Sequence, residues 1–143
     1  PPREQVSGCA TGTRMQVADL FYTTPARLKF LKKPQTELAH IQELVDCLAL
    51  SHPAVRFTLT LDGKTTLDTP GNGQLAQVAN HVFEPANWLT VDRQDDGMHL
   101  TGLITPPTVQ KATRRWLVML VNGRTVKCPV LTRAIESAYE QIL

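Results

Sequence analysis

The sequence predicts a mixed α/β (α+β) fold, because stretches with helical spacing of apolar residues alternate with stretches in which every second residue is apolar. The chain has 143 residues, which is room for one modest domain or for pieces of two. Hydrophobic residues make up 42% and charged residues 20% of it, as in soluble globular proteins and unlike disordered tails. Because the first residue is Pro1, we expect the chain to be cut from a longer protein.

The N-terminal part predicts a strand and then a short helix. Apolar and polar residues alternate over Thr13–Phe21, so we expect a strand that follows a turn at Gly12. The strand should end at Thr24-Pro25, since proline restricts the residue before it. Pro25 then suits the first turn of a short helix over Ala26–Leu31, where its missing N–H is harmless.

Three longer stretches have apolar residues at three- and four-residue steps, which predicts amphipathic helices. They are Leu38–Leu48, Leu75–Phe83 and Leu131–Ile142. Thr36 is available as the N-cap of the first helix. Pro53 and Pro85 lie beyond the ends of the first two, and Pro129 lies near the start of the third.

Period-two patterns predict strands joined by tight turns. Val55–Leu61 alternates strictly, so one face of this strand should be buried. Asp62-Gly63 is a strong hairpin signal, and we expect the chain to return antiparallel over Lys64–Asp68. A second pair of strands is expected to begin at Leu89 and to return over Met98–Ile104, and Asn122-Gly123 predicts another turn.

Three further segments bear on the organisation of the chain. Thr69–Gly73 is dense in turn-forming residues and is the best candidate for a domain boundary. Pro106–Arg115 is expected to be a basic loop. Trp116–Val121 is apolar on both alternating faces, which predicts a central strand covered on both sides.

Positive charge is segregated along the chain, although the net charge is only +2. The stretch from Gly97 to Ile135 has no Asp or Glu but contains Lys111, Arg114, Arg115, Arg124, Lys127 and Arg133. A second basic cluster consists of Arg27, Lys29, Lys32 and Lys33, and in residues 34–96 between them acids outnumber bases nine to three. Segregated positive charge attracts polyanions, with phosphate backbones as the first candidates. The alternative is a solvated basic face that binds nothing.

Several classes of protein find little support in the sequence. The cysteines Cys9, Cys47 and Cys128 are far apart and odd in number, and the four histidines lack ligand spacing, so neither a disulfide framework nor a metal site is expected. The longest apolar run is much shorter than the roughly 20 residues that span a bilayer. No paired carboxylates, nucleophile–His set or phosphate loop supports an independent small-molecule enzyme.

Gly12–Lys32 joins a Gly-Thr step, an alternating stretch, a Thr-Pro break and a basic amphipathic segment without a spare residue. This string resembles the passage that leaves the ATP site in the MutL family of DNA mismatch repair proteins. Leu120-Val121-Asn122-Gly123-Arg124, followed by Ala134-Ile135 and Ala138-Tyr139, resembles a strand-turn-helix hallmark of the same family. The resemblance covers roughly Val6–Leu143 and includes, in the same order, Thr36–Pro53 and Leu103–Pro107.

The resemblance implies a two-layer sandwich architecture in two parts. Residues 1–70 would be the C-terminal part of an ATPase domain of the gyrase, chaperone, histidine kinase and MutL (GHKL) superfamily, with the end of its sheet. Residues 71–143 would be the N-terminal part of a transducer domain, which is similar to the second domain of a small-subunit ribosomal protein. This division falls at the turn-rich segment identified above.

The resemblance also implies two binding surfaces. Gly12 and Thr13 match a motif of the ATP site in which the threonine hydroxyl supports the aspartate and the water that recognise adenine. Five residues match positions that line a positive, DNA-binding groove, namely Arg114, Arg115, Arg124, Lys127 and Arg133. We expect contact with the phosphates of double-stranded DNA, independent of sequence and strongly dependent on salt. Arg27, Lys29 and Lys32 match basic family positions, but a solvated helix face explains them equally well.

The sequence departs from the family pattern at several points. Thr23 stands where asparagine is usual, and Pro129 replaces a basic residue before the last helix. The catalytic glutamate motif, the Asp-x-Gly-x-Gly motif, the glycine-rich lid and the Asn-x-His-Pro-x-Lys segment are absent from the chain. We therefore expect no catalytic residues here, ATP and Mg²⁺ only in the parent protein, and no cofactor on this chain alone.

The resemblance implies a role in the bacterial cytoplasm, where the parent would couple ATP binding and dimer closure to DNA binding and strand-incision signalling. Its partners would be double-stranded DNA, a second copy of itself and a mismatch-recognition protein of the MutS type. The alternative is a free-standing, sequence-independent nucleic-acid-binding module with a ribosomal-type fold. Only the first hypothesis predicts that changing Thr13 weakens nucleotide binding.

Overall fold

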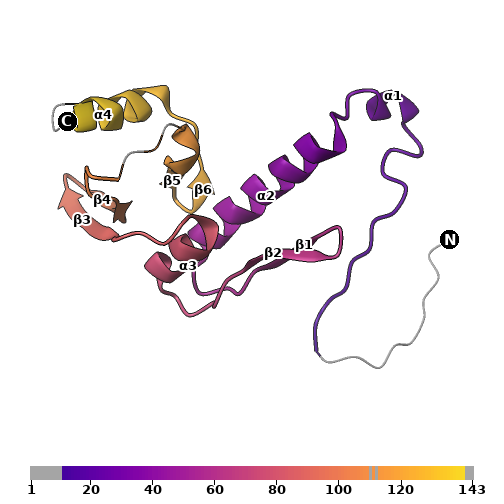
Figure 1. Cartoon of the computed structure of the whole chain (residues 1–143), viewed down its shortest axis with the longest axis horizontal. Helices are drawn as coiled ribbons and strands as arrows, with labels where there is room; N and C mark the ends of the chain where they lie inside the picture. Colours follow the sequence, from indigo (N-terminus) through magenta and orange to yellow (C-terminus); the bar gives the residue numbers. More distant parts are fainter. Residues whose placement is uncertain (1–10, 110, 112, 141–143) are drawn as a thin grey trace. The chain divides into compact units, whose positions relative to one another are not determined.

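The computed structural model describes residues 11–109, 111 and 113–140 (Figure 1). The chain divides into two compact units at Lys33, and each is described by itself. The described residues of the second unit combine three helices of eight or more residues with three two-stranded antiparallel sheets. The predicted mixed α/β class is therefore confirmed.

The first unit contains one short helix, α1 (Pro25–Leu28), which begins at the predicted proline and is shorter than expected. The strand predicted over Thr13–Phe21 is wrong, because the structure describes this stretch as irregular chain ending in turns. Asp19 and Phe21 adopt positive φ angles of 51° and 69°, which interrupt an extended backbone. The N–H of Tyr22 donates to the carbonyl of Asp19, which closes the first of these turns.

The second unit begins with the longest helix, α2 (Pro34–Ser51). Proline suits the first turn of a helix, since its missing N–H would have no helical partner there. The helix therefore starts at Pro34, and Thr36 lies inside it, so the predicted N-cap is wrong. Pro53 follows the end of the helix as expected. The face of α2 that turns inward buries Asp46, Ala49 and Leu50.

The predicted hairpin is present as β1 (Thr58–Leu61) and β2 (Lys64–Asp68), which pair antiparallel. Asp62 and Gly63 have φ angles of 49° and 78°, as a two-residue turn with left-handed backbone requires. The first strand begins three residues later than the alternation from Val55 predicted. A bulge between Leu59 and Thr60 shifts the register within the hairpin.

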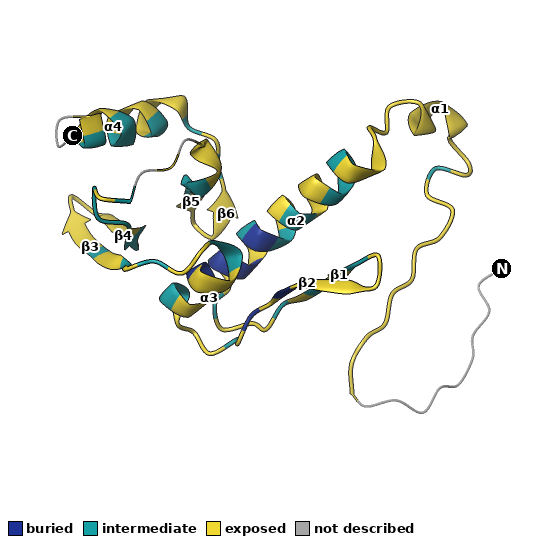
Figure 2. Ribbon diagram, in the orientation of Figure 1, coloured by how far each residue is buried: buried dark blue, intermediate teal, exposed yellow. Residues whose placement is uncertain are grey.

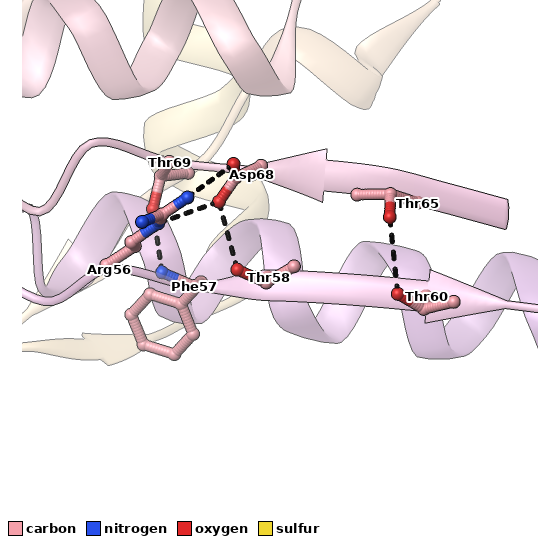
Figure 3. A network of polar contacts seen from close by, with 7 residues as sticks. All are labelled: Arg56, Phe57, Thr58, Thr60, Thr65, Asp68 and Thr69. Carbon is pink, nitrogen blue, oxygen red and sulfur yellow. Dashed lines mark hydrogen bonds and ion pairs between the residues drawn. The ribbon is translucent and has the colours of Figure 1, made fainter.

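Polar contacts continue the hairpin beyond the strand ends, as Figure 3 shows. Arg56 donates from Nε and Nη2 to the two carboxylate oxygens of Asp68 over 3.0 and 2.8 Å, and Thr58 Oγ1 donates to the same carboxylate over 2.9 Å. The hydrogen bond from Arg56 lowers the pKa of Asp68 to about 2. The N–H of Phe57 donates to Thr69 Oγ1, and the N–H of Thr69 donates back to the carbonyl of Phe57, both over 2.9 Å.

The hydrophobic core lies where α2, β2 and α3 (Leu75–Val82) meet, and Figure 2 shows the buried residues there. Its members come from all three elements, and they are Ala49, Leu50, Leu67, Val78 and Ala79. Ala49 and Val78 are fully buried. The predicted helix over Leu75–Phe83 is confirmed by α3, which ends just before Phe83 and Pro85.

A second hairpin follows, with β3 (Leu89–Asp95) paired antiparallel to β4 (Met98–Ile104) as predicted. Three aromatic rings connect this part of the chain to the core. Phe83 and Trp116 stack with ring centroids 4.8 Å apart, and Trp88 lies 6.0 Å from Trp116. Lys111 Nζ lies over the Trp116 ring at 4.4 Å from its centroid.

The central strand predicted over Trp116–Val121 is wrong. Residues Arg114–Trp116 form a 3₁₀ turn, η1, and only Leu120–Val121 pairs as a strand, β5, with Arg124–Thr125, β6. Both residues of β5 are exposed, so this strand is not covered on both sides. The turn at Asn122-Gly123 is confirmed by φ angles of 50° and 76°.

The chain closes with α4 (Pro129–Glu140), which confirms the predicted C-terminal helix as far as Glu140; Ile142 lies outside the described residues. The helix is anchored by Tyr139, whose hydroxyl donates to the carbonyl of Thr105 over 2.9 Å. Within the described part of the chain, no helix has the length and apolar character needed to cross a membrane.

Candidate nucleic-acid interface

An open groove of about 1180 Å³ runs along the second unit, between α2, η1 with the segment after it, and the start of α4. Apolar side chains from several elements form part of its lining, and they include Leu38, Leu61, Phe83, Val118 and Val126. Charged side chains form the rest, with the cations Arg114, Arg115, Lys127 and Arg133 and the acids Glu43, Asp46 and Glu136. The groove therefore combines an apolar surface with a dense set of charges of both signs.

Four of the five residues predicted to contact DNA line this groove. Arg114 and Arg115 come from η1, Lys127 follows β6, and Arg133 belongs to the second turn of α4. The fifth, Arg124, is exposed on β6 and is not among the lining residues. The structure thus brings together side chains that are up to 19 positions apart in the sequence.

Arg114 is held by Glu136 of α4. Its Nε donates to Glu136 Oε1 over 2.6 Å and its Nη2 donates to Glu136 Oε2 over 3.1 Å. Two parallel hydrogen bonds of this kind match the fork of a guanidinium to the two oxygens of a carboxylate. The Arg114 side chain remains 75% exposed, so the pair lies at the surface of the groove.

Arg115 is paired with a buried acid, Asp46 of α2. The distance from Arg115 Nη2 to Asp46 Oδ2 is 3.5 Å, and the Asp46 side chain is only 9% exposed. Gln42, one helical turn earlier, donates from Nε2 to Asp46 Oδ1 over 2.7 Å. Burial raises the pKa of Asp46 above its ordinary value, against the lowering effects of Gln42 and Arg115.

Acids in the groove were not predicted from the sequence, because the basic stretch itself contains none. Glu136 lies one residue beyond that stretch, and Asp46 is about 70 residues before Arg115 in the chain. One signal was present for Asp46. It occupies a helical position between Val45 and the apolar pair Ala49-Leu50, where a lone carboxylate needs a partner.

Lys127 and Arg133 differ from the two η1 arginines. Within the described part of the chain, neither of them forms an ion pair, and the same holds for Arg124. All three side chains belong to exposed residues. They are therefore available to an anionic ligand without loss of an internal contact.

Two cysteines also line the groove, and both are half-buried free thiols. Burial raises the pKa of Cys47, so its thiol stays protonated at neutral pH. A protonated thiol is a weak nucleophile, which argues against a catalytic role for Cys47. Among the described residues, no group of three or more His, Cys, Asp or Glu side chains could hold a metal ion.

The predicted nucleotide-binding residues belong to the first unit. Gly12 and Thr13 are exposed and lie outside regular secondary structure. A threonine hydroxyl can both donate and accept a hydrogen bond, so Thr13 fits one contact with a nucleotide base. Arg27, on α1, and Lys29, just after it, are also exposed.

Comparisons with known proteins identify the family. The family model described as "DNA mismatch repair protein, C-terminal domain" matches residues 75–143. The DNA mismatch repair protein MutL of Lactobacillus delbrueckii subsp. bulgaricus is 40% identical over 139 residues, which covers 95% of this chain and 21% of that protein. The MutL protein of Paramagnetospirillum magneticum is 42% identical over 141 residues and covers 92% of this chain and 23% of its own length. The chain belongs to the MutL family.

A solved structure of this family has a similar fold. The Aquifex aeolicus MutL ATPase domain complexed with ADP superposes with a TM-score of 0.70 at 28% sequence identity, over 85% of this chain and 46% of that one. The resemblance seen in the sequence alone is thus confirmed. This MutL-family chain spans about a fifth of the length of the curated relatives it matches.

Proposed function

We propose that this chain is part of a MutL-type DNA mismatch repair protein, which couples ATP binding and dimer closure to DNA binding and strand-incision signalling. The observation that carries the proposal is the extent of the sequence similarity. It runs at 40% identity over 95% of the chain and therefore includes both the Gly12 string and the groove. In this proposal residues 1–70 belong to the ATPase domain and residues 71–143 to the transducer domain.

DNA binding is assigned to the groove and its neighbourhood. Phosphates need only long cationic side chains in reach, and Lys127, Arg133 and Arg124 are exposed and without an ion pair among the described residues. The three half-buried rings of Phe83, Trp88 and Trp116 pack on one another. Their packing supports contact with the phosphates of duplex DNA rather than base stacking on a single strand.

A salt titration of binding to a duplex DNA of arbitrary sequence tests this assignment. Changing Lys127 and Arg133 to Gln should weaken binding and reduce the slope of log K against log salt by about 1.8, since each lost phosphate contact removes about 0.9. Lys64→Gln with Arg93→Gln is the matched control, because it removes the same charge from the two hairpins. If both double variants behave alike, the groove is not the DNA-binding surface.

ATP is assigned to the parent protein as a whole. Thr13 can supply one hydrogen bond to the base or to a water beside it. In the intact parent, Thr13→Val should lower nucleotide affinity, whereas Thr24→Val should not; equal affinities of the two variants would contradict the assignment of Thr13.

The further partners in this proposal are a second copy of the protein and a mismatch-recognition protein of the MutS type, in the bacterial cytoplasm. The alternative, a free-standing nucleic-acid-binding module, rested on the acid-free stretch Gly97–Ile135. In three dimensions the cations of that stretch are mixed with Asp46 and Glu136. This mixture removes most of the support for an independent basic module.

A further inference from the structure

The acids in the groove hold two arginines in different ways, and the difference has a functional meaning. Arg115 reaches a carboxylate that is almost completely buried, and its withdrawal would leave Asp46 with only Gln42. Leaving a buried charge without its partner is costly, so the Arg115–Asp46 contact contributes to the stability of the fold. The acid partner of Arg114 is not buried in this way.

The Arg114–Glu136 pair is open to water on both sides. The side chains are 75% and 35% exposed, and exposed ion pairs add little to the stability of a fold. Stability therefore gives no sufficient reason for this contact. Its geometry does resemble another interaction, because the same two guanidinium nitrogens bind two oxygens of a phosphate in a fork.

Glu136 also lies close to a second groove cation. Arg133 is three positions earlier on α4, and residues three apart share one face of a helix. Both residues line the groove. A phosphate that takes the place of the Glu136 carboxylate at Arg114 would therefore lie near a cation that has no ion pair among the described residues.

We propose that Glu136 is an internal competitor of phosphate, which occupies Arg114 until a polyanion displaces it. The proposal rests on the DNA-binding role of the groove and adds a regulatory element to it. Displacement exchanges one carboxylate for one phosphate at the same guanidinium, and no covalent step is involved. Weak or isolated anions would therefore leave Glu136 bound to Arg114, whereas an extended phosphate backbone would displace it.

The test is the affinity of the full chain for a duplex DNA probe as a function of salt, for Glu136→Gln and for the matched control Glu140→Gln. Both changes remove one negative charge from α4, but Glu140 does not line the groove. Glu136→Gln should raise the affinity about two- to fivefold, the range of an exposed ion pair. The salt slope should stay unchanged, because Arg114 contacts a phosphate in the DNA complex of both proteins.

A double-mutant cycle shows whether the gain acts through Arg114. Arg114→Gln should abolish the increase produced by Glu136→Gln, and it should weaken DNA binding less in the presence of Glu136 than in the Glu136→Gln background. Equal increases for Glu136→Gln and Glu140→Gln, or an increase that persists when Arg114 is changed to Gln, would overturn the proposal. Circular dichroism of each variant verifies that the helix content is unchanged.

The same titration separates failure of this inference from failure of the proposed function. If the Lys127 and Arg133 double variant binds DNA as the unchanged chain does, the groove is not the binding surface and both ideas fall. If that variant binds more weakly while Glu136→Gln leaves the affinity unchanged, only the competitor role of Glu136 is refuted.

Discussion

Replacing Arg115 by alanine should destabilise the protein through Asp46, and the size of the effect can be bounded from the structure. Two unit charges 3.5 Å apart attract by roughly 5 kcal/mol at an effective dielectric constant of about 20. Arg115 is 64% exposed, so water screens much of this attraction. Removing one partner of a buried pair costs about 3–5 kcal/mol, and an exposed pair contributes about 0–1 kcal/mol. We therefore expect a loss of about 2 kcal/mol at neutral pH for this mixed case.

The loss should depend on pH with a definite sign. Burial holds the pKa of folded Asp46 above its ordinary value of 3.8. Below that value the carboxyl is neutral in the folded and unfolded states, so Arg115 has no charge to compensate. The cost of Arg115→Ala should therefore be small near pH 3.5 and should grow as the pH rises through the pKa of folded Asp46, since Arg115 is one of the groups that lower this pKa.

Urea unfolding followed by circular dichroism measures the effect. With a slope of about 2 kcal/mol per molar urea, Arg115→Ala should lower the midpoint by about 1 M at neutral pH. Arg114→Ala is the control, since Arg114 is 75% exposed and its partner Glu136 is only half-buried, so the expected loss is below about 1 kcal/mol. The reasoning is refuted if the two alanine variants lose equal stability, or if Arg115→Ala costs as much in an Asp46→Asn background as in the unchanged chain.

Three further predictions concern the hairpin and the turn beside it. Thr69→Val keeps the shape of the side chain but removes the acceptor of the Phe57 N–H, so the free energy of unfolding should fall by about 1–3 kcal/mol. Thr66→Val, at an exposed position, is the control and should change the free energy of unfolding by less than about 0.5 kcal/mol. Gly71→Ala should lower the free energy of unfolding by more than about 1 kcal/mol, because a Cβ there would lie 2.5 Å from the backbone nitrogen of Arg56 and the φ angle of Gly71 is +66°. A smaller loss, measured by urea unfolding, would mean that the turn adapts. NMR titration of Asp68 should give a pKa of about 2. Because this pKa is depressed, the contribution of Asp68 to stability is present above about pH 3.8 and is lost as the pH falls through about 2. In Arg56→Gln the pKa of Asp68 should return toward its ordinary value, and an unchanged pKa would contradict the assigned cause.

The features that the sequence predicted correctly depend on local chemistry. Asp62-Gly63 and Asn122-Gly123 form left-handed turns because their backbone conformations favour these residue types. The helix α3 follows from apolar spacing and from the proline after it. In each case the information is contained within a few consecutive residues.

The incorrect predictions concern properties that depend on distant partners. Alternation over Thr13–Phe21 and continuous apolarity over Trp116–Val121 both suit a strand, but a strand also needs a neighbour with which to form hydrogen bonds. The groove shows the same limit. Four of its cations come from the basic stretch, whereas Asp46 and Glu136 enter it through tertiary packing and change which cations are available.

The composition of the core has a consequence for motion between the two proposed parts of the protein. Ala49, Leu50 and Leu67 precede the turn at Gly71, while Val78 and Ala79 follow it, and all five pack together. A hinge at that turn would have to pull α3 away from α2 and β2 and expose this core to water. We therefore expect the transducer part to pivot after α3. In that case α3, the first helix of the proposed transducer part, would move as a rigid body with α2 and β2 of the proposed ATPase part.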